Sequence, residues 1–158
     1  MTFAEMVRPE AIIHELGSTE RNGAIRELVE SLANCGAVNS EHVDRIVKSI
    51  TTRERTRGTT GFGKGVAAPH TKIDGQESVA VAIGRSSVGI DFQSLDGEPV
   101  FGIFLIASPA DQPELHLRAM DMVFRQLQDE QFRKFLRQSK DSGAIRVLLD
   151  EADQRSDA

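Results

Sequence analysis

Two histidines in this 158-residue chain stand in surroundings that suit phosphate chemistry. The first, His70, ends the run Thr59-Thr60-Gly61-Phe62-Gly63-Lys64-Gly65-Val66-Ala67-Ala68-Pro69-His70. Alternating glycines let a backbone turn sharply and approach a ligand closely, and Pro69 stiffens the chain just before the histidine. The run therefore predicts a phosphate-binding loop beside a firmly held histidine; the alternative is a glycine-rich turn with an incidental histidine. The candidate loop residues are Thr60, Gly61, Gly63 and Gly65.

The second histidine, His116, follows Pro113 by three residues and lies in the first turn of a predicted helix. Free N–H groups and the positive end of the helix dipole favour anions at such a position. The helix also follows an apolar run that predicts a central strand, and ligand sites in α/β folds lie at the ends of such strands. We expect the two histidines to share one phosphate site. A surface histidine is the alternative, and a zinc pair lacks a third ligand at a suitable spacing.

The glycines fail two nucleotide-binding patterns. Gly58, Gly63 and Lys64 match the first positions of a nucleotide P-loop, but Gly65 stands where that motif needs a serine or threonine for magnesium. The preceding segment is polar and rich in arginine, whereas the motif needs a hydrophobic strand. The spacing of the glycines also departs from the dinucleotide fingerprint. The loop is therefore not predicted to bind a nucleotide.

Three arginines, Arg53, Arg55 and Arg57, stand just before the loop. A solvated run of charge is the default interpretation of this segment. In the alternative, one arginine folds back over the loop and binds phosphate oxygens through two guanidinium N–H groups.

The elements that position these residues alternate between strands and helices. Apolar residues at three- and four-residue spacing predict helices over 19–34, 40–50, 113–127, 129–138 and 142–151. Short apolar runs predict strands at 11–13, 78–84 and 88–92, and the most apolar run, 99–108, predicts the central strand. This order is typical of the α/β class. We expect a single domain over residues 1–158, with a core at about 9–152 and frayed termini.

Composition narrows the class of protein further. The chain has 39% hydrophobic and 27% charged residues, as ordinary soluble domains have, and a net charge of −5 that argues against a nucleic-acid binder. No apolar run is long enough to cross a membrane, and residues 1–5 do not resemble a secretory signal. The single cysteine, Cys35, excludes an intramolecular disulfide. We expect a cytoplasmic protein without membrane insertion, metal or cofactor.

Together these motifs resemble the enzyme IIA domain of the fructose/mannitol type in the bacterial phosphotransferase system, most of all its nitrogen-regulatory branch. The resemblance covers about residues 9–152 and rests first on the run from Thr59 to His70, which is similar to the family pattern S/T-T-G-x-G-x-G-x-A-x-P-H. Three further segments support it: Asp91-Phe92, Leu95-Asp96-Gly97-Glu98-Pro99-Val100, and Ser108-Pro109-Ala110-Asp111 followed by His116-Leu117. Several linked motifs in the right order make the resemblance specific.

The resemblance implies a single α/β domain with a mixed sheet flanked by helices, the mannitol-type enzyme IIA fold. It implies that the phosphocarrier protein HPr phosphorylates His70, with Nε2 as the attacking atom, and that His116 supports the phosphoryl group without carrying it. The group then passes to a IIB domain, or its presence signals to a regulatory partner. We favour the regulatory role because the chain resembles the stand-alone regulators.

One departure from the family pattern leaves the arginine open. The family has an Arg-Glu pair before the glycine that corresponds to Gly58, and ungapped alignment places Glu54 and Arg55 there. Arg53, after a one-residue insertion, or Arg55 could take the arginine's place. The displacement is also the reason to keep an alternative function, a regulatory binding module with the same fold that has lost phosphotransfer.

Overall fold

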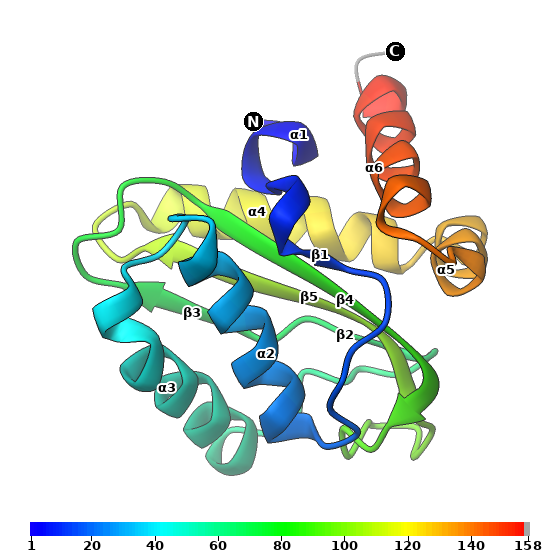
Figure 1. Ribbon diagram of the computed structural model, residues 1–158, viewed down its shortest axis with the longest axis horizontal. Helices are drawn as coiled ribbons and strands as arrows, with labels where there is room; N and C mark the ends of the chain where they lie inside the picture. Colours follow the sequence, from blue (N-terminus) through cyan, green and yellow to red (C-terminus); the bar gives the residue numbers. More distant parts are fainter. Residues whose placement is uncertain (157–158) are drawn as a thin grey trace.

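The computed structural model describes residues 1–156 and contains a five-stranded mixed sheet (Figure 1). The strands are β1 (Ile12–Ile13), β2 (Val66–Ala67), β3 (His70–Ile73), β4 (Ala80–Ile90) and β5 (Val100–Pro109). The order is β1-β4-β5-β2, with β3 also pairing with β5 beyond β2. β4 and β5 are antiparallel, whereas β1 runs parallel to β4, and β2 and β3 run parallel to β5. The α/β class and the mixed sheet expected from the sequence are confirmed.

β5 is the centre of the sheet because its sequence is apolar on both faces. Every residue of the strand except Phe101 is buried, as a strand covered by helices on both sides requires. Its partner β4 joins the segments 78–84 and 88–92, which the sequence pattern predicts as separate strands. The ladder shifts register between Arg85 and Ile90, and Gly89 takes a positive φ of 86° there. A glycine at such a bulge lets one long strand bend where the sequence pattern looks broken.

Helices cover both faces of the sheet (Figure 1). The helices are α1 (Phe3–Met6), α2 (Arg21–Asn34), α3 (Val43–Thr56), α4 (Pro113–Leu127), α5 (Glu130–Gln138) and α6 (Ser142–Ser156). Apolar residues of α2 and α3 form one core against the sheet, and those of α1, α4, α5 and α6 form a second. Short 3₁₀ helices at Pro9–Ala11 and Ser40–His42 precede β1 and α3.

The helix boundaries follow local signals with small differences. α2 begins at Arg21, two residues later than the expected start at residue 19, and the side chain of its N-cap residue Glu20 makes no capping hydrogen bond. Gly36 takes a φ of 76° just beyond the end of α2, as a helix stop does. Asn39 accepts a hydrogen bond from the Glu41 N–H and caps the 3₁₀ turn that leads into α3.

Both ends of the described chain belong to the packed structure, in contrast to the expected frayed termini. α6 continues past residue 151 to Ser156, and the Asp153 carboxylate accepts hydrogen bonds from the Phe3 and Ala4 N–H groups at 2.8 and 3.0 Å. Phe3 and Met6 are buried in the core of that face. The core therefore extends beyond 9–152 because each terminus supplies a partner for the other. The last two residues of the expected tail, 157–158, lie outside the described part.

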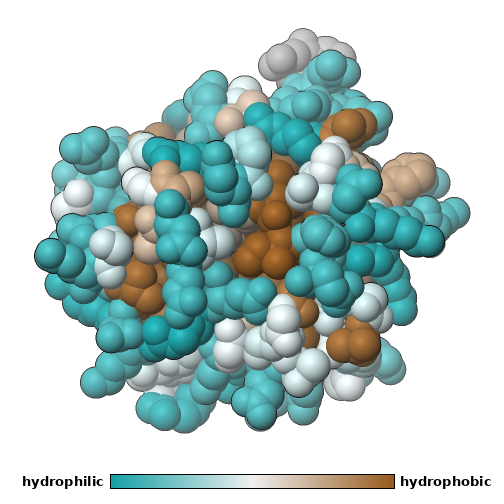
Figure 2. Space-filling view, viewed as in Figure 1, coloured by the Kyte–Doolittle hydropathy of each residue, from teal (hydrophilic) through white to brown (hydrophobic). Residues whose placement is uncertain are grey.

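Figure 2 shows one face of the molecule, which is largely hydrophilic, with hydrophobic colour in a central patch and in smaller separate ones. Among residues 1–156, no helix has the length and hydropathy that a membrane span requires.

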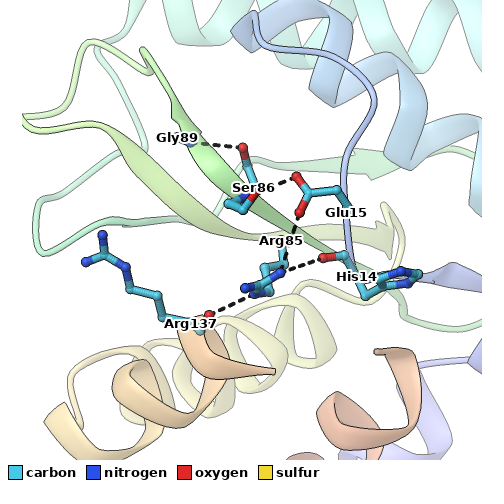
Figure 3. A network of polar contacts seen from close by, with 7 residues as sticks. His14, Glu15, Arg85, Ser86, Gly89 and Arg137 are labelled. Atoms are coloured by element: carbon cyan, nitrogen blue, oxygen red, sulfur yellow. Dashed lines mark hydrogen bonds and ion pairs between the residues drawn. The ribbon is translucent and has the colours of Figure 1, made fainter. Parts of the chain in front are cut away.

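A network of polar contacts centred on Arg85 joins β4 to neighbouring segments (Figure 3). The Arg85 side chain donates hydrogen bonds to the carbonyl groups of Arg137 and His14 at 2.8 and 3.2 Å, and it lies 3.5 Å from a Glu15 carboxylate oxygen. The other Glu15 oxygen accepts from the Ser87 N–H. One guanidinium therefore joins β4, the segment after β1 and the end of α5.

Candidate functional site

The two candidate histidines line one open pocket of about 760 Å³. β3 supplies His70 and α4 supplies His116, while one face of α3 forms the opposite wall. β3 lies at the edge of the sheet beside β5, and α3 packs against it. The lining residues are Arg45, Lys48, Ser49, Thr52, Arg53, Thr56, Arg57, His70, Thr71, Lys72 and His116. The pocket is therefore rich in cations and hydroxyl groups.

The local chain holds the His70 ring in a defined orientation. Its Nδ1 lies 2.9 Å from the carbonyl oxygen of Ala68. A carbonyl oxygen can only accept, so Nδ1 carries the proton and Nε2 keeps its lone pair. Pro69 fixes the backbone between the two residues, and the Pro69 carbonyl is itself bonded to the Ile106 N–H in β5. The ring therefore presents a nucleophilic nitrogen from a rigid support.

Electrostatics keep His70 neutral near pH 7. Burial lowers the pKa of His70, the bond to the Ala68 carbonyl opposes this shift, and the charges of Arg53 and Lys72 add to the lowering. A pKa below the usual 6.5 leaves the imidazole uncharged at physiological pH. A neutral imidazole is the nucleophilic form.

His116 lies on the first turns of α4, within reach of the His70 ring. The two ring centroids are 5.5 Å apart, and His116 Nδ1 lies 2.8 Å from the hydroxyl of Ser108. Ser108 is fully buried near the end of β5, so it fixes the second ring from the sheet. Burial, followed by the electrostatic influence of His70, Lys72 and Arg53, lowers the pKa of His116 to about 4. Both rings are therefore neutral at pH 7.

The structure distinguishes Arg53 from Arg55, the two candidates for the arginine near the histidines. α3 continues to Thr56, and its helical period places Arg53 on the face that lines the histidine pocket. Arg55 is exposed and does not line the pocket, whereas Arg57, just after the helix, does. The geometry thus brings Arg53 to the two histidines and leaves Arg55 outside.

The glycine loop does not reach the pocket, contrary to the expectation that its N–H groups would surround a phosphate. None of Thr60, Gly61, Gly63 and Gly65 lines the pocket. The Thr60 N–H and hydroxyl both donate to the buried carboxylate of Glu54, and the Gly61 N–H donates to the Thr59 hydroxyl. Gly65 has a φ of 80° and packs so close to the Phe101 ring that a side chain would collide with it. The glycines therefore serve the path of the chain that leads to His70.

The sequence pattern assigns no role to several residues around the histidines. They are Arg45, Lys48, Lys72 and Ser108. Spacing could have identified three of these residues. Lys72 follows His70 by two residues and so shares its strand face. Arg45 and Lys48 recur with Arg53 at helical spacing. Ser108 belongs to a segment that supports the family resemblance, but the pattern does not predict its bond to His116, because that bond depends on where α4 packs on β5.

The described residues contain no group of three or more histidine, cysteine, aspartate or glutamate side chains placed to hold a metal ion. The pocket instead combines two neutral imidazoles with several cations. Such a combination can bind a phosphoryl group and offers a nitrogen that can bond to it. The fold and the pocket together indicate a protein that handles phosphoryl groups through histidine.

Comparison with known proteins gives the family. Residues 5–152 match the family described as the phosphoenolpyruvate-dependent sugar phosphotransferase system, EIIA 2. A nitrogen regulatory protein of Bradyrhizobium diazoefficiens is 34% identical over 149 residues, which are 94% of this chain and 95% of that protein. The chain therefore belongs to the EIIA 2 family of the phosphotransferase system, and the family expected from the sequence is confirmed. A phosphocarrier or regulatory role follows, and a module that has lost phosphotransfer is not favoured.

Solved structures agree on the fold. The nitrogen regulatory protein IIA-Ntr of Neisseria meningitidis superposes with a TM-score of 0.82 at 22% identity, over 93% of this chain and 98% of that one. The mannitol enzyme IIA of Escherichia coli, in a complex with phosphorylated enzyme IIB, superposes with a TM-score of 0.72 at 19% identity, over 92% and 99% of the two chains.

Proposed function

We propose that this protein accepts a phosphoryl group on Nε2 of His70 from an HPr-like phosphodonor. The observation that carries the proposal is the hydrogen bond from His70 Nδ1–H to the Ala68 carbonyl, which leaves Nε2 as the free nucleophile in a basic pocket. Membership in the EIIA family supplies the reaction class.

The transfer balances without a cofactor. The Nε2 lone pair of His70 forms a new N–P bond as the N–P bond to the donor histidine breaks, and the donor nitrogen keeps the electron pair of its broken bond. The His70 ring becomes more positive as it bonds to phosphorus, and the Ala68 carbonyl next to Nδ1–H stabilises that charge. In-line phosphoryl transfer depends mainly on positioning and on neutralising the equatorial oxygens.

The neighbours of His70 divide this work. Arg53 and Lys72 supply positive charge to the oxygens, and their influence on the pKa of His70 supports their proximity to its ring. His116 is neutral and held by Ser108, so one of its ring nitrogens can donate a hydrogen bond to a phosphoryl oxygen. In this assignment, Arg53 and His116 stabilise the group, His70 carries it, and Arg55 takes no part.

The direct test is labelling in the presence of phosphoenolpyruvate, enzyme I and HPr. An acid-labile phosphate should appear on the wild-type chain and be absent from His70→Ala. His116→Ala should still be labelled at His70, at a rate lower by roughly a hundredfold, the usual scale for loss of one stabilising donor. Arg53→Ala should slow labelling and Arg55→Ala should not. Labelling that survives His70→Ala would remove the site assignment.

We further infer that phosphorylation serves a regulatory output. The support is the nitrogen regulatory relative, which this chain matches over 94% of its own length. The E. coli mannitol enzyme IIA forms a complex with its IIB, so transfer to a IIB domain is the competing outcome. A chase of the labelled chain with a fructose-type IIB domain distinguishes the two. Rapid loss of the label to IIB would favour the transport role over the regulatory one.

A further inference from the structure

The pocket holds two imidazoles that charge alone does not distinguish. The ring centroids of His70 and His116 are 5.5 Å apart, and burial lowers the pKa of both, so both rings are neutral at pH 7. A neutral imidazole has a proton on one nitrogen and a lone pair on the other, and only the lone pair can attack phosphorus. The position of the proton on each ring therefore decides which histidine can accept a phosphoryl group and which can only donate a hydrogen bond to it.

The Ser108 hydroxyl determines the position of the proton on His116. Ser108 is 0% exposed, and its Oγ lies 2.8 Å from His116 Nδ1. Within residues 1–156 this hydroxyl has no other hydrogen-bond partner. If Nδ1 carried the proton, Oγ would accept it, and the hydroxyl hydrogen would be buried without an acceptor, at the desolvation cost of an unpaired polar group. If the hydroxyl donates to Nδ1 instead, no buried hydrogen is left unpaired. The second arrangement is favoured, so Nε2 of His116 carries the proton.

The two rings are therefore held in opposite tautomers. His70 donates its Nδ1–H to the Ala68 carbonyl and keeps a lone pair on Nε2. His116 accepts at Nδ1, and its Nε2 has no partner in the described part of the chain, although the ring lines the pocket. His116 can thus donate Nε2–H to a phosphoryl oxygen, but it has no free lone pair with which to attack phosphorus.

β5 supports both rings through residues on one of its faces. The Pro69 carbonyl accepts from the N–H of Ile106, which is the register partner of His70. Ser108 lies two residues further along β5 and so shares the strand face of Ile106, which α4 covers. We propose that Ser108 is a positioning residue that holds His116 as the Nε2–H tautomer and so reserves the phosphoryl group for His70. This inference rests on the proposed function, because it explains how that site divides two roles between two neutral histidines.

The tautomers can be measured without any phosphoryl transfer. Long-range ¹H–¹⁵N correlation spectra of the ¹⁵N-labelled full chain at pH 7 show which nitrogen of each ring carries the proton, with His70→Gln and His116→Gln as assignment variants. We expect an Nδ1–H ring for His70 and an Nε2–H ring for His116. Ser108→Ala should move His116 toward the pattern of a tautomer mixture. The matched control Ser31→Ala removes another buried hydroxyl, one that donates to the Leu28 carbonyl in α2, and should leave both rings unchanged. An Nδ1–H form of His116 in the wild type, or a His116 pattern that Ser108→Ala leaves unchanged, would overturn the assignment.

Labelling with phosphoenolpyruvate, enzyme I and HPr tests the consequence for transfer. Ser108→Ala should slow labelling of His70 about fivefold, the scale of one hydrogen bond, and Ser31→Ala should stay within about twofold of the wild type. In His116→Gln the side-chain amide can donate without help from Ser108. Adding Ser108→Ala to that variant should therefore change the rate by less than about twofold.

Two kinetic outcomes oppose the inference. Equal slowing by Ser108→Ala in the wild-type and His116→Gln backgrounds would show that the serine acts on the structure and not through His116. A wild-type rate in Ser108→Ala would show that the serine has no part in transfer. A wild type that HPr never labels removes the proposed function, and the ring spectra then decide alone whether Ser108 sets the tautomer of His116.

Discussion

The hydrogen bond between His70 and Ala68 determines which nitrogen of the ring can react. It commits the Nδ1 proton to a backbone carbonyl, so only Nε2 offers a lone pair. The sequence motif predicts a firmly held histidine, and the structure identifies the hydrogen bond that holds its ring. Ser108 holds the second ring in a similar way, from the buried end of β5.

The two histidines should titrate below the usual range. Burial is the main cause of both lowered pKa values, so His116 should titrate near pH 4 and His70 below 6.5. The unfolded chain binds these protons more readily, and the folding free energy should therefore weaken as the pH falls from about 6.5 toward 4. Labelling should likewise slow as His70 becomes protonated. The measurement is an NMR titration of the ring protons, assigned with His70→Gln and His116→Gln. A midpoint at or above 6.5 for His116 would contradict the burial argument.

Glu54 should prove to be a structural partner of the loop before His70. Its buried carboxylate accepts two hydrogen bonds from Thr60. Glu54→Gln turns one acceptor into a donor and should lower the free energy of unfolding by about 1–3 kcal/mol, the cost of a mispaired buried group. Urea denaturation measures this change. Glu77→Gln, at an exposed position, is the control and should leave the midpoint nearly unchanged.

At the scale of single residues, the sequence predicts which histidines form the candidate site better than it predicts which residues surround them. His70 and His116 are recognisable from their flanking proline, glycine and helix-start signals. The choice between Arg53 and Arg55 depends on how far α3 continues before the chain turns, and a run rich in arginine does not reveal that end point. The glycines suggest a phosphate-binding loop, whereas Thr60 of that loop is bonded to Glu54. The sequence pattern places Glu54 near the family's Arg-Glu position but does not predict that it binds the loop.

At the scale of elements, periodicity predicts most helices and the central strand. The apolar run of β5 and the three- and four-residue spacing in α2, α3 and α4 agree with the structure. β4 is the informative exception, because Gly89 and the polar residues before it divide one strand into two apparent ones. Which strands pair cannot be read from such patterns, since pairing depends on helices packing over both faces.

Arg85 should hold the bulged end of β4 in place (Figure 3). Arg85→Ala removes its hydrogen bonds to the Arg137 and His14 carbonyls and its ion pair with Glu15. We expect a loss of about 1–3 kcal/mol in unfolding free energy, because a largely buried side chain leaves two carbonyls without their donor. Thermal unfolding of Arg85→Ala, with Arg125→Ala as an exposed control from a surface ion pair, measures it. Equal midpoints for the two variants would show that the network contributes little.

At the scale of the whole molecule, α1 and α6 join the two ends of the described chain. Asp153 supplies acceptors to two N–H groups at the start of α1, a contact that no local sequence pattern predicts because 149 or more positions separate the partners. Asp153→Ala should cost about 1 kcal/mol, the usual value of a helix N-cap. The lowered melting temperature should recover largely in Asp153→Asn, which keeps one acceptor. A melting temperature unaffected by Asp153→Ala would mean that apolar packing alone holds α1.

The position of β5 has a consequence for the order in which the protein assembles. β4 and β5 are neighbours in sequence, whereas β3 pairs with β5 through partners such as His70 and Ile106, which are far apart along the chain. Distant contacts cost more chain entropy to form. We therefore expect the β4–β5 pair to form early and the β3–β5 pairing, which brings His70 to the pocket, to form late. In native-state hydrogen exchange, amides of β3 should open before those of β5. β3, the strand that carries His70, would then be the part of the sheet that opens most often.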